Sequence, residues 1–122
     1  MSKLLIIFLT GIPIFLYSAE KDINLAWCAS VSGDDEYRTK DGTYVDCLTD
    51  EYAIEVEYDY KWKEGIGQAL HYAESTNKQA AILFIKRAKS RKDYYNEMMR
   101  VIDKYDLPIK VFVIEEQGEK YD

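Results

Sequence analysis

The side chains that could carry out chemistry gather in one central stretch of the chain. In order along the sequence they are Asp46, Glu55, Glu57, Gln68 and Tyr72. Acids from neighbouring strands and polar groups from a following helix can converge on one site. Carboxylate and carbonyl oxygens are the ligands that Mg²⁺ or Mn²⁺ prefers. The stretch therefore predicts a site for a divalent metal.

Strand alternation predicts how the acids lie. Residues 43–48 and Tyr52–Tyr58 are rich in β-branched and aromatic residues, which favours two strands. Side chains alternate between the faces of a strand, so Glu55 and Glu57 share one face. If the two strands pair as a hairpin, Asp46 faces Glu55. Two such carboxylates repel each other unless a proton or a cation joins them.

The next segment predicts a helix that begins at Asp59 and ends near Thr76, where Asn77 follows. Its apolar stripe, with Trp62 and Ala69, must face the core. His71 falls on the outer side and is interpreted as a surface residue. The polar stripe that borders the core holds Lys61, Gly65, Gln68 and Tyr72.

The remaining elements complete an α/β pattern. A helix at 22–31 precedes a short strand at 37–39, and the turn at 40–42 contains the Asp-Gly pair that favours a hairpin. The continuous apolar run at 80–85 predicts a strand covered on both faces. A helix at 90–105, with Ser90 as its cap, and a strand at 109–114 follow. The order αβββαβαβ predicts a mixed central sheet flanked by helices.

These residues resemble the PD-(D/E)XK nuclease superfamily. Asp46, followed by Glu55, Val56 and Glu57 and then by a Gln-x-x-x-Tyr helix motif, is similar to its RecB-like branch. The resemblance covers nearly all of residues 20–122 and implies a restriction endonuclease-like core. The wider segment, from Val45 to Ala73, is also similar to a group of small exported bacterial proteins with this core.

The resemblance implies roles for the matching positions. Asp46, Glu55 and the backbone carbonyl of Val56 would be metal ligands, and Gln68 and Tyr72 would hold the site or the nucleic-acid backbone. The chain departs from the family where a lysine is replaced by Glu57. Two compensations stay open. Lys61 could supply the missing ammonium group, or Glu57 could itself be a metal ligand or general base. The plainer alternative is that these acids are only a solvated strand face.

The first 19 residues read as a secretory signal peptide. A basic start at Lys3 is followed by an apolar stretch to Tyr17 and by Ser18 and Ala19. The stretch is short for a membrane span, which needs about 20 residues. An uncleaved anchor is the alternative. We therefore expect one domain at 20–122 in the periplasm or outside the cell.

Two cysteines, Cys28 and Cys47, lie in the expected exported part. In an exported protein a pair of cysteines more often forms a disulfide than a metal site. The bond would tie the first helix to the second strand. The chain-entropy model gives about 3 kcal/mol of stabilisation for a loop of this size. Two free buried thiols are the alternative.

Charge bears on the choice of partner. The net charge is −6, from 16 basic and 22 acidic residues, which disfavours tight binding of duplex nucleic acid. The one basic cluster spans residues 86–92 and is either a phosphate-binding edge or a solvated loop. Two functions therefore remain: a metal-dependent nuclease outside the cytoplasm, or an inactive nuclease-fold module that binds a protein. The eleven tyrosines favour the second, because tyrosine is common at protein contacts.

Overall fold

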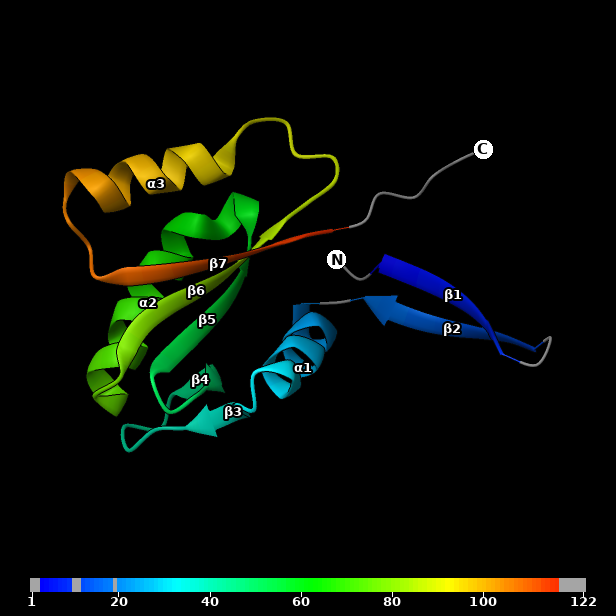
Figure 1. The fold of residues 1–122 in the computed structure, drawn as a ribbon, viewed down its shortest axis with the longest axis horizontal. Helices are drawn as coiled ribbons and strands as arrows, with labels where there is room; N and C mark the ends of the chain where they lie inside the picture. Colours follow the sequence, from blue (N-terminus) through cyan, green and yellow to red (C-terminus); the bar gives the residue numbers. More distant parts are fainter. Residues whose placement is uncertain (1–2, 10–11, 19, 117–122) are drawn as a thin grey trace.

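The protein has a mixed α/β fold built on a five-stranded mixed sheet and three helices (Figure 1). The computed structural model describes residues 3–9, 12–18 and 20–116. The strands are β1 (Lys3–Leu9), β2 (Ile12–Ser18), β3 (Asp34–Arg38), β4 (Tyr44–Leu48), β5 (Tyr52–Tyr58), β6 (Gln79–Lys86) and β7 (Ile109–Glu115). The helices are α1 (Glu20–Ser30), α2 (Trp62–Thr76) and α3 (Tyr94–Lys104), and a 3₁₀ turn spans Asp59–Lys61.

The strands of the main sheet lie in the order β3-β4-β5-β6-β7. β3, β4 and β5 are antiparallel neighbours, and β5, β6 and β7 are parallel. Gly42, in the turn between β3 and β4, has a φ of 89°, which glycine adopts without strain. Asn77 ends α2 in a left-handed conformation, with a φ of 55°. The expected hairpin and helix end are therefore both confirmed.

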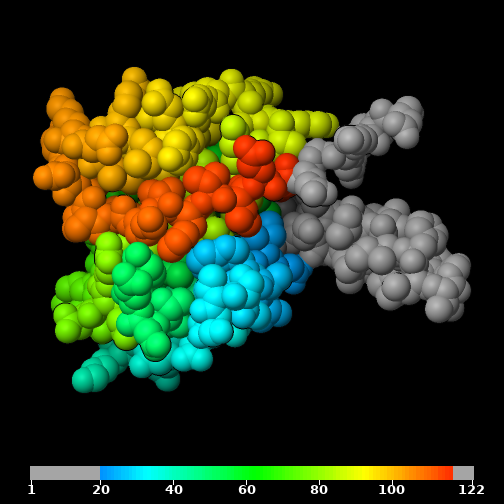
Figure 2. Space-filling view, viewed as in Figure 1, coloured from blue at the N-terminus to red at the C-terminus, as the bar shows by residue number. Residues whose placement is uncertain are grey.

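The sheet has an apolar core on each face. α1 covers one face, where its residues pack with Cys47 and Ile54, while α2 and α3 cover the other. β6 contributes alternate residues to both cores, which confirms the prediction of a strand buried on both faces. In Figure 2, β7 crosses the visible face between α3 and α1. Burial of β6 on both faces makes it the centre of the fold.

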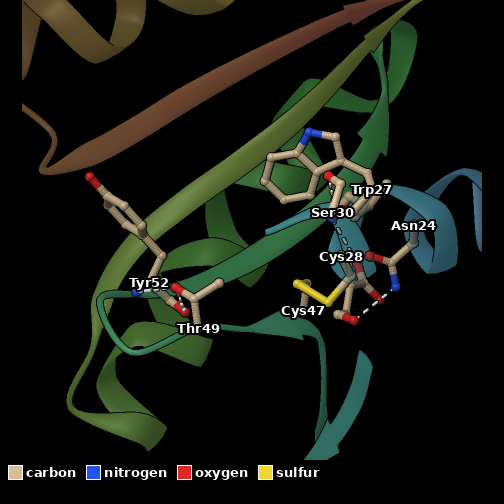
Figure 3. The surroundings of a disulfide bond; sticks show 9 residues. Asn24, Trp27, Cys28, Ser30, Cys47, Thr49 and Tyr52 are labelled. Atoms are coloured by element: carbon tan, nitrogen blue, oxygen red, sulfur yellow. Dashed lines mark hydrogen bonds between the residues drawn. A yellow bond between two sulfur atoms is a disulfide. The ribbon is translucent and has the colours of Figure 1, made fainter. Parts of the chain in front are cut away.

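A disulfide joins Cys28 of α1 to Cys47 of β4, as the sequence predicted (Figure 3). Both cysteines are buried in the core on the α1 side. Gly33 lies against the bond. A methyl group at this position would be 2.5 Å from the Cys47 sulfur and 2.7 Å from the Cys28 sulfur. The bond therefore fixes α1 against β4 and requires a glycine in the loop that follows the helix.

Two predicted helix starts were wrong. Asp59 does not cap α2; it is buried, accepts from the Arg87 Nε at 2.7 Å and also accepts from Ser90. An unpaired buried carboxylate costs more free energy than an uncapped helix, so Asp59 pairs with Arg87. Ser90 is occupied by this contact, and Asp93 caps α3 by accepting from the Asn96 amide at 3.0 Å.

β1 and β2 pair as a separate antiparallel two-stranded sheet, with Lys3 opposite Ser18. The sequence did not predict these strands. The expected signal peptide at 1–19 stays a prediction, and the cleavage position at Ala19 lies outside the described residues. In the described part of the chain, no helix has the length and apolar character needed to cross a membrane.

The contact between Gly33 and the disulfide gives a stability prediction. Gly33→Ala should lower the free energy of unfolding by about 1–3 kcal/mol, because a methyl group overpacks the two sulfurs. For a domain of this size we expect a fall of at least about 4 °C in Tm by calorimetry. Gly67→Ala is the matched control, since no described residue lies within 4 Å of its added methyl group and α2 gains a better helix former. An unchanged Tm for Gly33→Ala would contradict the packing.

Candidate functional site

The candidate site lies where β4 separates from β5. The ladder between these strands pairs only Cys47 with Ile54 and Leu48 with Ala53, whereas β5 continues to Tyr58. Beyond the ladder, the Asp46 carboxylate accepts a hydrogen bond from the Val56 amide at 2.8 Å. A strand residue directs its N–H and C=O to the same edge. The Val56 carbonyl is therefore directed into the fork between the strands.

Asp46 and Glu55 form a pair of acids in this fork. The two side chains lie close enough for the Asp46 charge to oppose ionisation of Glu55, so Glu55 stays protonated at neutral pH. Burial and the neighbouring Asp46 charge raise the pKa of Glu55 to about 11, and burial also raises the pKa of Asp46. Glu55 is only 4% exposed, and its Oε2 has no hydrogen-bond partner among the described residues. One buried acid oxygen is thus left without a donor.

Glu57 lies beside this pair, on the α2 side of β5. A methyl group built on Gly65 would be 3.4 Å from its Cβ and Cγ, so α2 packs closely over the side chain. Burial first, and then the Glu20 charge, raise the pKa of Glu57 to about 7. Lys61 opposes this rise. Glu57 is therefore an acid that exchanges its proton near neutral pH.

Three predicted site residues come from the 3₁₀ turn and α2, and they differ in how close they lie to the acids. They are Lys61, Tyr72 and Gln68. Lys61 is exposed, and its charge lowers the pKa of both Glu57 and Glu20. Tyr72 is half-buried, and burial together with the charges of Glu55 and Asp46 raises its pKa to about 12. The structure brings both residues close to the site. Gln68 is exposed on α2, and within the described part of the chain no contact places it beside the acids.

Sequence analysis missed two residues of α1 that belong to this site. Glu20 begins the helix, and burial followed by the Asp46 charge raises its pKa. Asn24 is 4% exposed, and its Nδ2 donates to the Asp46 carbonyl at 2.8 Å. The two lie one helical turn apart, and this i, i+4 spacing was the signal that could have identified them. The positive end of the helix dipole lies among the acids and favours their charge.

Two other polar groups have a structural explanation. Asp41 accepts from the ring of His71 at 3.0 Å and from Ser75 at 3.1 Å, which ties the β3–β4 turn to α2. His71 is exposed, as predicted for a surface residue. In the basic cluster at 86–92, Arg87 pairs with buried Asp59 and Lys92 pairs with an acid of α3. The contacts of Asp41 hold the β3–β4 turn against α2, and the two ion pairs hold the loop that follows β6.

The site offers only oxygen donors, and these are suited to a hard divalent cation. Among the described residues, no three His, Cys, Asp or Glu side chains are already arranged to hold a metal ion. Their repulsion is instead relieved by the proton that Glu55 keeps at neutral pH. Replacing that proton by a cation would remove the repulsion between the acids. The unpartnered Glu55 oxygen would then be a ligand of the cation. The donor set therefore fits Mg²⁺ or Mn²⁺.

The chain is similar to three proteins of Acanthamoeba polyphaga mimivirus that are named for a KilA-N domain. L33 is 31% identical over 104 residues, which are 85% of this chain and 41% of L33. R878 is 34% identical and L32 is 37% identical, each over 77 residues, which are 63% of this chain and 21% or 20% of the relative. The chain spans less than half the length of these relatives. No family model and no solved structure matches it.

The raised pKa of Glu57 predicts a pH-dependent stability. Between its unfolded value of 4.5 and about 7, the folded protein holds a proton that the unfolded chain releases, so stability falls as pH rises through this window. Glu57→Gln copies the protonated side chain. In a chelating buffer, its Tm should match that of the parent at pH 4 and exceed it by at least about 4 °C at pH 8.

Glu74→Gln is the control for this measurement, because Glu74 is an exposed acid on the same helix that packs over Glu57. Its Tm should differ from that of the parent by the same amount at both pH values. A parallel shift for Glu57→Gln as well would show that Glu57 titrates as an ordinary surface acid.

Proposed function

We propose that this chain is a nuclease-like domain with a restriction endonuclease-like core, in which a divalent metal assists hydrolysis of a phosphodiester. Three features support the core: the element order from α1 to β7, the antiparallel β3–β4–β5 unit and the parallel β5–β6–β7 unit. The Gln-x-x-x-Tyr motif follows on α2, directly after the acidic strand.

One observation carries the proposal. Acids from α1, β4 and β5 converge in the fork between two strands, and a buried oxygen of Glu55 has no donor there. Burying several carboxyl groups together costs free energy, which a protein without a use for them would avoid by exposing them or replacing them. Asp46, Glu55 and the Val56 carbonyl would hold the metal. The ion would polarise the phosphate and lower the pKa of a bound water.

The chain's own residues would then position the reactants and move the proton. Glu57, with a pKa of about 7, suits a general base that accepts the proton of the attacking water at neutral pH. Lys61 lies close enough to lower the pKa of Glu57 and would offset charge on the phosphate. Tyr72 and, further out, Gln68 would contact the nucleic-acid backbone. Glu57 would thus activate the water and Lys61 would offset the negative charge, two roles that a single lysine fills in the family.

The compartment is part of the same proposal. A disulfide that fixes α1 beside the acids persists in an oxidising environment, which supports a periplasmic or secreted protein. The net charge of −6 still opposes the approach of nucleic acid, so any substrate must be drawn by the metal and by Lys61 rather than by a basic surface.

Metal-dependent cleavage tests this function. The oxidised protein is offered single- and double-stranded DNA and RNA with Mg²⁺ or Mn²⁺. We expect cleavage that falls at least about 100-fold in Asp46→Asn, Glu55→Gln and Lys61→Ala, because each variant removes a ligand or a charge from the reaction. Glu74→Gln, an exposed acid away from the fork, should keep parental activity. Absence of cleavage, with no Mn²⁺ binding by calorimetry, would refute the proposal.

A second candidate is an inactive nuclease-fold module that binds a protein partner. Tyr37 and Tyr44, on the neighbouring strands β3 and β4, are 42% and 52% exposed, and Glu57 adds charge that repels phosphate. The mimivirus relatives are longer than the region they share with this chain, which is compatible with a module. Retention on nucleic acid at low salt separates the candidates. Only phosphate-dependent binding should weaken steeply as salt rises.

A further inference from the structure

A hollow of about 430 Å³ lies between the start of α1 and the fork in the sheet. Its lining residues are Glu20, Lys21, Asn24, Glu36, Asp46 and Val56. Asp46 and Val56 are the residues that already meet in the fork, where the amide of one donates to the carboxylate of the other. The hollow therefore opens onto Asp46 from the α1 side.

Asn24 supplies the observation that points to a ligand. Its side chain is buried, at 4% exposure, and its Nδ2 is used by the Asp46 carbonyl at 2.8 Å. That hydrogen bond fixes the amide group, so its oxygen cannot turn outward. Oδ1 is buried and has no hydrogen-bond partner among the described residues. A buried amide oxygen without a partner is costly, and a cation bound in the hollow would satisfy it.

The disulfide holds this helix in place. Cys28 lies one turn after Asn24 on α1, and Cys47 is the neighbour of Asp46 on β4 (Figure 3). The bond thus joins the two elements at the point where Asn24 reaches across to Asp46. Without it, α1 would be held against the sheet mainly by the packing of Ile23 and Trp27.

We propose that α1 completes the divalent cation site, with Asn24 Oδ1 and the Glu20 carboxylate as further oxygen donors, and that the Cys28–Cys47 bond keeps them there. This inference rests on the cation site of the proposed function. It adds that α1, on the opposite face from α2, sets the affinity for the ion. Loss of the bond would release two donors from the site while the acids of β4 and β5 remain.

Calorimetric titration of the full oxidised chain with Mn²⁺ alone tests this inference. Asn24→Ala and Glu20→Gln should each weaken binding at least about tenfold, and so should the Cys28→Ser/Cys47→Ser double variant. Asp22→Asn is the matched control, because it removes an exposed charge from the first turn of the same helix and should keep the parental affinity. Circular dichroism checks that each protein is folded.

The outcomes separate this inference from the proposed function. If the parent binds Mn²⁺ and Glu55→Gln abolishes binding, while Asn24→Ala and Glu20→Gln bind as the parent does, the inference is wrong and the fork alone holds the ion. If the parent binds no Mn²⁺, both are wrong. Should the double cysteine variant fail to fold, the two single variants decide the question, because they keep the disulfide.

Discussion

Burial of carboxyl groups in the fork between β4 and β5 is the constraint around which this domain is arranged. Glu55 and Glu57 are 4% and 5% exposed, and Asp46 adds a third acid beside them. Like charges this close cannot all stay ionised, so Glu55 keeps its proton at neutral pH. Three groups stabilise the charged forms of these acids. They are the Val56 amide, the positive end of the α1 dipole and Lys61.

The two faces of the sheet contribute to this site in different ways. On one face, Gly65 lets α2 approach Glu57 closely. The same helix places Tyr72 near the acids. On the other, the Cys28–Cys47 bond anchors α1 so that Asn24 reaches the Asp46 carbonyl. Early separation of β4 from β5 is what lets both helices reach the same point. A longer ladder would have covered the edge of β5 with another strand and closed the fork.

Much of this arrangement follows from local sequence pattern. Strand alternation and the expected hairpin of β4 with β5 were sufficient to bring Asp46 and Glu55 together, and the apolar run of β6 identified the central strand. Contacts distant in sequence were not predictable in the same way. Asp59 has the residue type of a helix cap, yet it is buried against Arg87, 28 residues later in the chain. Glu20 was assigned to the residues just after a cleavage position, so its place beside the acids went unnoticed.

Site-resolved pH titration of the glutamate carboxyl carbons by ¹³C NMR, in a chelating buffer, tests the central claim most directly. If the acids are buried together in the fork, Glu57 titrates near pH 7 and Glu55 keeps its proton well into the alkaline range. Addition of Mg²⁺ should then shift both resonances and release the proton of Glu55. Ordinary titration of both residues near pH 4.5, with no response to Mg²⁺, would show that these acids are a solvated strand face and that the domain has no site there.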